Sequence, residues 1–215
     1  MFFLENLDAF STLSVLVLFL FKRPKIKGVV LWLLLYVFSN FIFNIIELII
    51  FVYPQLLGLK STNNLLAYHL SCIVNVYILY NFFCLILHSR VTRFVDLFFV
   101  VPFIILSIFN FIYLKRTFTI YGLTSIWVVI KCLSYYAEKF KAPPKEDLLT
   151  SRVFWMVSGF FLYYAVAFFI FMAYDFITEG VLNGVITNIL HIWLVHNVIL
   201  AISCCFYSRS ILCKE

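Results

Sequence analysis

Three polar residues recur on one face of a strongly apolar segment in the first quarter of the chain. Asn40, Asn44 and Glu47 are spaced at i, i+4 and i+7, so in a helix they fall within a stripe about 60° wide. An ionisable residue inside a membrane is energetically costly and usually faces the interior of a helix bundle. The stripe has two interpretations. The amides bond neighbouring helices while Glu47 is protonated or paired, or the stripe binds a ligand or a proton.

Polar residues of other apolar segments are expected to lie at about the same depth in the membrane as Glu47. Glu47 lies about six residues from the outer end of its segment, or ~9 Å at the helical rise. A glutamate and two histidines could hold a cation, a lipid headgroup or a proton. For each histidine the alternative is an ordinary residue at the membrane interface. We predict an outer-facing polar pocket with these candidate ligand-binding residues: Asn40, Asn44, Glu47, His69, Asn110, Asn188 and His191.

The spacing of the histidines argues against a zinc enzyme. Seven-span lipid hydrolases place a histidine pair in their last span, and this chain has His191 and His196 there. A separation of five residues puts the two rings ~140° apart around a helix. Two residues of one helix that bind the same metal are spaced i, i+3 or i, i+4. A phosphate-binding loop and a nucleophile elbow are also missing from the sequence. We expect no catalytic residue, metal or cofactor, and a lipid hydrolase stays the enzymatic alternative.

The elements that must position these residues are membrane-spanning helices. Of the 215 residues, 65% are hydrophobic and only 12% are charged, a composition typical of an integral membrane protein. A spanning helix needs roughly 20 apolar residues, and the runs are continuously apolar rather than alternating, which favours helices over a barrel. We predict an all-α fold, a single domain over residues 1–215 with seven transmembrane helices. The predicted spans cover residues 4–21, 28–53, 62–87, 94–114, 117–138, 152–177 and 182–207.

Basic residues occupy every second gap between these runs. Twelve of the sixteen Lys and Arg residues fall on one side, and only Lys60, Lys115 and Arg116 fall on the other. The positive-inside rule therefore places the N-terminus outside and the C-terminus in the cytoplasm of a multi-pass inner-membrane protein. Anionic headgroups of the bilayer account for the net charge of +6, so no nucleic-acid partner is expected. Lys131, the remaining basic residue, lies within a span ~10 Å from the cytoplasmic interface, where we expect it to snorkel rather than to meet Glu47.

The cytoplasmic side also offers a surface for a protein partner. Its basic residues could contact such a partner, and the alternative is that they only determine topology. The candidate partner residues are Arg90, Arg93, Lys139, Lys141, Lys145 and Arg152.

One segment resembles a known family. Residues 154–163 read Phe-Trp-Met-Val-Ser-Gly-Phe-Phe-Leu-Tyr, which is similar to the F-W-x-x-x-G-x-x-x-Y segment of an uncharacterised seven-span inner-membrane family common in Bacteroidota. The last span, where His196-Asn197 precedes Leu200, is similar in style to that family's final helix. The resemblance implies a compact seven-span sensor or accessory module that signals to a partner. We therefore expect a sensory or accessory signalling protein that binds a small molecule or lipid, with a small-solute transporter as a further alternative.

Overall fold

Helices make up nearly all of the described part of the chain. The computed structural model describes residues 6–52, 65–87, 90–113, 117–141, 147–182 and 190–213, and these contain no strand. The all-α prediction is confirmed for this part of the chain. Its seven α-helices are α2 (Leu7–Lys22), α3 (Val29–Val52), α4 (Leu65–Ile86), α5 (Arg90–Tyr113), α6 (Thr117–Lys141), α7 (Arg152–Leu182) and α8 (Leu190–Leu212), with a short 3-10 turn, η2 (Leu148–Thr150), before α7.

Each helix corresponds to one predicted apolar run, and the largest differences are in α7 and α8. Helix α8 begins at Leu190 and continues to Leu212, beyond the last apolar run. Its polar positions are compatible with a helix because their hydroxyls bond the helix's own backbone. The Ser203 hydroxyl donates to the carbonyl of Ile199, and Ser210 donates to that of Tyr207.

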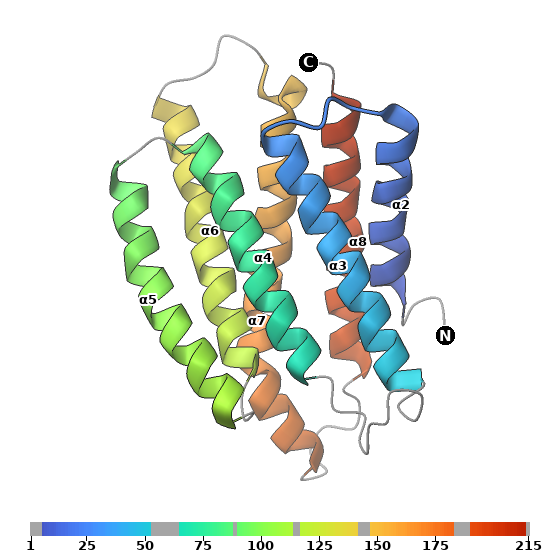
Figure 1. The fold of residues 1–215 in the computed structure, drawn as a ribbon, viewed down its shortest axis with the longest axis vertical. Helices are drawn as coiled ribbons and strands as arrows, with labels where there is room; N and C mark the ends of the chain where they lie inside the picture. The colour runs from blue at the N-terminus through green and yellow to red at the C-terminus, as the bar shows by residue number, and fades with distance from the viewer. Residues whose placement is uncertain are drawn as a thin grey trace.

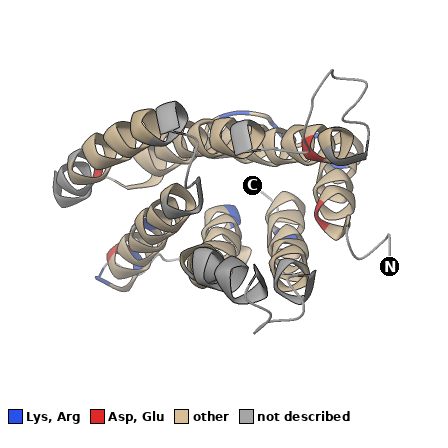
Figure 2. Ribbon diagram, turned by 90° about the horizontal axis from the view of Figure 1, so that it is seen from below, with Lys and Arg blue, Asp and Glu red and all other residues tan. Residues whose placement is uncertain are grey.

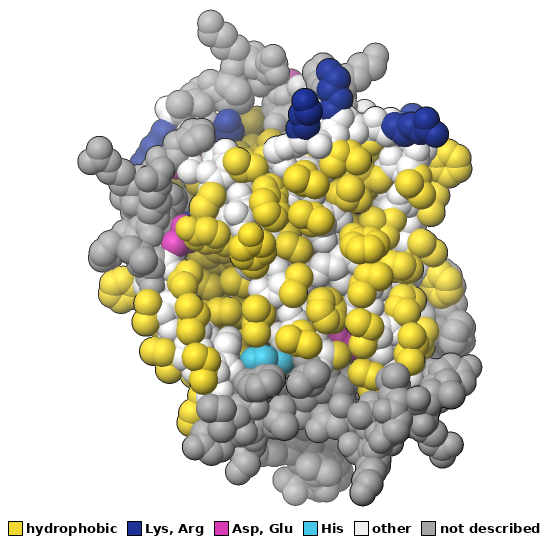
Figure 3. Space-filling model, in the orientation of Figure 1, with side chains coloured by type: hydrophobic (Ala, Val, Ile, Leu, Met, Phe, Trp, Pro, Cys, Tyr) yellow, Lys and Arg dark blue, Asp and Glu magenta, His cyan; other side chains and the backbone are white. Residues whose placement is uncertain are grey.

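Within the described residues, five helices are long and apolar enough to cross a membrane, as expected for a multi-pass membrane protein. These helices are α3, α4, α6, α7 and α8. Helix α2 has 16 residues, and α5 contributes a shorter apolar stretch, Phe98–Phe109. Apolar side chains cover much of the described part of the face seen in Figure 3, and Lys and Arg side chains lie at its upper edge. Viewed along the bundle, charged residues occupy only a small part of the described ribbon (Figure 2).

Contacts between helices link six of the described helices into a closed ring, and Figure 1 shows these helices from the side. Going round it, α2 packs on α3, α3 on α4, α4 on α6, α6 on α7, α7 on α8, and α8 returns to α2. Helix α5 stands outside this ring and packs chiefly on α6. Consecutive helices run in opposite directions, so α2 begins at the lower end of the view and α8 ends at the upper end (Figure 1).

The upper end of the bundle carries a basic segment and is called the basic end below. Helix α2 stops at Lys22, where Arg23 adopts a left-handed conformation with φ of 41° and its N–H bonds the carbonyl of Phe19. This is a common way to satisfy the last carbonyls of a helix. Lys22, Arg23, Lys25 and Lys27 are all exposed around this turn.

Aromatic side chains fill the ring near the basic end. Phe160 of α7 makes edge-to-face contacts with Tyr36 and Phe82, at centroid distances of 5.0 and 5.1 Å. Helices α7 and α8 approach closely at Gly159, where an added Cβ would lie 2.5 Å from the ring of Tyr207. This half of the ring is therefore tightly packed, which leaves the opposite half to hold any site.

A buried ion pair attaches α5 to the ring. Lys131 of α6 lies 2.5 Å from Asp96 of α5, and the Trp127 indole N–H donates to the same carboxylate at 3.0 Å. Lys131 is only 2% exposed. The snorkelling expected for Lys131 is thus wrong, because a carboxylate on the neighbouring helix neutralises the ammonium where it stands.

Candidate functional site

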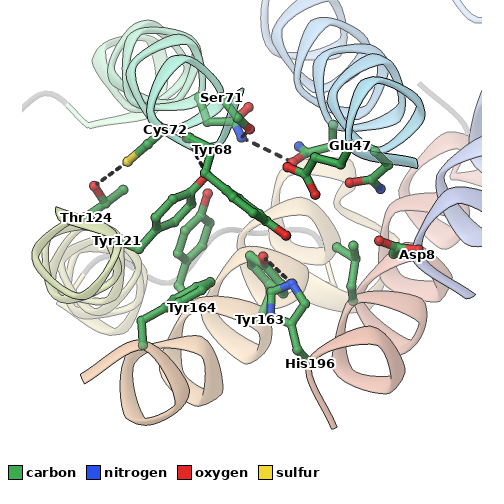
Figure 4. A pocket seen from close by; sticks show the side chains of 15 residues that line it. Asp8, Glu47, Tyr68, Ser71, Cys72, Tyr121, Thr124, Tyr163, Tyr164 and His196 are labelled. Atoms are coloured by element: carbon green, nitrogen blue, oxygen red, sulfur yellow. Dashed lines mark hydrogen bonds between the residues drawn. The ribbon is translucent and has the colours of Figure 1, made fainter. Parts of the chain in front are cut away.

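A polar cavity lies inside the ring, and Figure 4 shows the side chains that line it. Its lining residues Asp8 and Glu47 place it in the half away from the basic end. Its volume is about 40 Å³. All six ring helices contribute to its wall, and α5 contributes none of the described lining residues. The lining consists of Asp8, Asn40, Asn44, Glu47, Tyr68, Ser71, Cys72, Asn75, Tyr121, Thr124, Tyr163, Tyr164, Phe171, His196 and Leu200.

The polar stripe of α3 faces this cavity. Asn40, Asn44 and Glu47 all line it, as the i, i+4, i+7 spacing requires for one helix face. The structure thus brings together three of the seven residues predicted for the pocket.

The other four predicted residues do not add to the described wall. His69 is buried on α4 but faces α5, where its ring hydrogen-bonds the backbone of Ser107. Asn110 and His191 are in helices α5 and α8, but their side chains are outside the described set. Asn188 lies outside the described residues altogether.

Amide groups close the end of the cavity that faces the aromatic core. The Asn75 amide donates to the Asn40 carbonyl oxygen at 3.1 Å, and the Ser39 hydroxyl donates to the Asn75 carbonyl oxygen at 3.3 Å. Asn40 in turn donates to the backbone carbonyl of Tyr36 at 2.8 Å. These bonds tie α3 to α4 and engage both the amide nitrogen and the carbonyl oxygen of Asn40 and of Asn75. Their role is therefore structural, and we call Ser39, Asn40 and Asn75 the amide floor of the cavity.

Asn44 and Glu47 lie further from this floor. The Asn44 amide nitrogen is buried and makes no hydrogen bond to any described residue. A buried donor without a partner is rare, because leaving it unsatisfied costs about 1–3 kcal/mol. Glu47 forms a hydrogen bond with the side chain of Tyr68. This part of the α3 stripe, which is further from the basic end, is available to water or to a ligand.

A second carboxyl group comes from α2. Asp8 stands in the first turn of that helix, where a negative charge is favourable, and its carboxylate accepts from the backbone N–H of Ala9 at 2.8 Å. It also lines the cavity that contains Glu47. Sequence reasoning did not connect the two residues, because they lie on different helices and share no spacing pattern.

Aromatic side chains form the wall opposite α3 and α2. Tyr121 donates to the backbone carbonyl of Tyr68 at 2.7 Å, and its ring lies 4.7 Å from that of Phe171. Tyr163 is within 3.4 Å of the Nε2 atom of His196. From the sequence, His196 was considered as a zinc ligand and not as a pocket residue, yet it is a wall residue held between Tyr163 and Phe171.

The charge of the cavity is unbalanced among the described residues. Its lining contains two carboxyl groups and neither Lys nor Arg. Lys131, the buried lysine, is paired with Asp96 outside the cavity wall. A carboxylate in so apolar a bundle must take up a proton or a cation, since an uncompensated buried charge is strongly unfavourable.

The donor atoms of the wall are mostly oxygen. In the part of the chain that the structure describes, no three His, Cys, Asp or Glu residues are grouped so as to hold a metal ion. Carboxylate, amide and hydroxyl oxygens favour hard cations or hydrogen-bond donors over zinc. The cavity therefore suits a ligand that donates hydrogen bonds and carries positive charge.

The predicted partner surface is described only in part. Lys139 lies over the ring of Tyr135 at 5.6 Å, and Lys141 is exposed. Arg152 donates through Nε to the backbone carbonyl of Cys213 at 2.8 Å, which joins the start of α7 to the end of α8. The side chains of Arg90 and Arg93 are not described, and Lys145 is outside the described residues.

The chain matches no protein-family model, no curated protein and no solved structure. The resemblance to a seven-span family of Bacteroidota therefore remains a prediction, and function must be argued from the cavity.

Proposed function

We propose that this protein is a multi-pass inner-membrane sensor or accessory protein that binds a small solute in the cavity and signals its occupancy to a cytoplasmic partner. The observation that carries the proposal is the unbalanced polar interior. One cavity is lined by Asp8, Glu47 and Asn44, and the Asn44 amide nitrogen has no partner among the described residues. Intramembrane ionisable groups of this kind usually mark a binding or transport site.

The size of the cavity limits what it holds. A water molecule needs roughly 10–15 Å³ of such space, so the 40 Å³ cavity accommodates a few waters or one very small solute. A lipid headgroup is too large for it in this conformation. The proposal therefore narrows the expected small molecule or lipid to a small solute.

The positive-inside rule supports entry from the outer side. The exposed basic residues around Arg23 mark the basic end as cytoplasmic under that rule. Glu47 lies 18 residues along α3 from Val29, which corresponds to ~27 Å from the basic end. Tyr36 and Phe160, which are both buried, pack between that end and the cavity. A solute would thus reach Glu47 from the outside.

Two ring helices link the cavity to the proposed signalling surface. Helix α7 runs from Arg152 at the basic end to Phe171 in the cavity wall, and α6 runs from Tyr121 in the wall to Lys139 and Lys141. A change in packing around the cavity would move rigid helices whose other ends are basic. We assign the partner surface to Lys139, Lys141 and Arg152, together with Arg90, Arg93 and Lys145.

Native mass spectrometry tests the binding role. The gently purified protein should carry a small bound species, and Glu47→Gln should lose it. Glu138→Gln is the matched control, because Glu138 is on α6 near the basic end and does not line the cavity. The proposal would be contradicted if Glu47→Gln retained the bound species as well as Glu138→Gln does. It would also be contradicted if wild type carried no bound species. A stoichiometric metal found by elemental analysis would favour the lipid hydrolase instead.

A further inference from the structure

We infer that the solute is a small organic ammonium ion, of the size of a protonated primary alkylamine. This inference rests on the proposed binding function and names the class of ligand. Three features of the cavity point to it: the two carboxyl groups, the aromatic wall and the small volume.

The carboxyl groups select for positive charge. Asp8 and Glu47 approach the same space from α2 and α3, and the described lining supplies no Lys or Arg to neutralise them. An anion would be repelled, and a neutral solute would leave the charge uncompensated. The bound species must therefore be a cation, or protons must occupy the site.

The aromatic wall favours an organic cation over an alkali ion. Five of the lining residues carry a benzene-type ring: Tyr68, Tyr121, Tyr163, Tyr164 and Phe171. Ring faces attract ammonium groups and the alkyl carbons attached to them, and such rings recur in sites for organic ammonium ligands. Phe171, packed against Tyr121 at 4.7 Å, has no oxygen to offer to a metal ion.

Hydrogen bonding suits a primary ammonium group. Such a group has three N–H donors and no acceptor. The carboxylates of Asp8 and Glu47 can accept them directly, and the wall hydroxyls supply further acceptors. The Asn44 amide nitrogen, which makes no bond to a described residue, lies beside Glu47 and can orient that carboxylate or a water molecule. With space of about 40 Å³, the cavity admits a short alkyl chain and no more.

Equilibrium dialysis with radiolabelled methylammonium tests this inference on the intact protein in detergent. Wild type should bind the probe saturably. Excess ethylammonium should displace it, whereas sodium and the uncharged acetamide should not. These competitions need no variant, so they remain informative even where a substitution impairs folding.

Variants then assign the recognition to the two parts of the site. Glu47→Gln should weaken methylammonium binding about tenfold or more, equivalent to at least ~1.4 kcal/mol, whereas Glu138→Gln should leave it unchanged. Tyr121→Phe keeps the ring and should retain binding, whereas Tyr121→Leu should weaken it. Tyr77→Leu controls for the loss of a tyrosine, because Tyr77 is 63% exposed on α4.

Each contrary result has a defined meaning. Displacement by sodium, together with loss of binding in Tyr121→Phe, would show an alkali-ion site and overturn the inference. Displacement by acetamide would show that charge is not recognised. If native mass spectrometry finds a ligand that Glu47→Gln loses but methylammonium does not bind, the inference fails and the proposed function stands. If neither a ligand nor the probe binds, both fail.

Discussion

The ammonium group of Lys131 on α6 lies 2.5 Å from the carboxylate of Asp96 on α5, with both residues buried. The indole of Trp127 donates a hydrogen bond to the same carboxylate and lies 5.9 Å from the ammonium. This pair gives α5, the helix outside the ring, a specific polar attachment to α6. It also leaves the cavity carboxyl groups without a lysine, so its integrity bears on the charge of the site.

Breaking this pair from one side should destabilise the protein. Lys131→Met leaves Asp96 buried and unpaired, and we expect a loss of about 3–5 kcal/mol of unfolding free energy. The double variant Asp96→Asn/Lys131→Met should recover most of that loss, because an asparagine still accepts the Trp127 N–H bond without carrying charge. Unfolding in mixed micelles would measure both. Equal stability of the single variant and wild type would show that the pair contributes nothing.

Two glycines should respond differently to the addition of a methyl group. An added Cβ at Gly159 would meet the Tyr207 ring at 2.5 Å, whereas one at Gly122 would meet the Sδ atom of Met172 at 2.7 Å. The Tyr207 ring is fully buried and packed against Phe160, but Met172 is partly exposed and flexible. Gly159→Ala should therefore lower the melting temperature clearly more than Gly122→Ala. The reverse order would contradict the packing of α7 against α8.

The amide floor should stabilise the α3–α4 contact. Asn75→Leu removes the bonds to Asn40 and Ser39 and leaves the buried Ser39 and the partly buried Asn40 without those partners, at an expected cost of about 1–3 kcal/mol. Asn81 offers a matched control, because its amide bonds the backbone of its own helix, at Tyr77. Asn81→Leu should change thermal stability little. Similar losses at the two positions would mean that the inter-helix bonds have no special importance.

Much of this fold can be read from the sequence because apolar runs determine where membrane helices can form. The position of α3, for example, follows from the run 28–53, and the inward face of Asn40, Asn44 and Glu47 follows from helical spacing. Seven such runs correspond to the seven described helices. The end of α8 was less predictable, since its serine hydroxyls bond the backbone locally and do not stop the helix.

Contacts between helices could not be read in the same way. Asp8 and His196 join the α3 stripe only because α2 and α8 are neighbours in the ring. Asp96 could not be identified as a pairing residue from the sequence, because it lies near the start of its apolar run. An acidic residue is common there in a helix that begins at the membrane interface. Its pairing with Lys131 depends on the packing of α5 against α6, which no periodicity within either segment reveals.

Acid should weaken binding of an ammonium ligand. Protons and cations compete for the carboxyl groups of Asp8 and Glu47, so a higher proton concentration leaves fewer ionised carboxylates to bind methylammonium. Affinity in dialysis should fall as the buffer is changed from neutral to mildly acidic. In Glu47→Gln the residual affinity should depend less on pH. A wild-type affinity that is constant or rises in acid would contradict the assignment of these carboxyl groups.

Side-specific labelling of a cysteine at position 44 tests the central claim, a solute-binding cavity open to the outside, most directly. In a background with the six native cysteines replaced, Asn44→Cys would be exposed to a membrane-impermeant thiosulfonate from each side of sealed vesicles. Leu33→Cys, on the same helix in the packed half of the ring, is the control. The account predicts labelling at position 44 from the outer side alone, slowed by methylammonium, and none at position 33. Labelling from the basic side, or equal resistance at both positions, would contradict it.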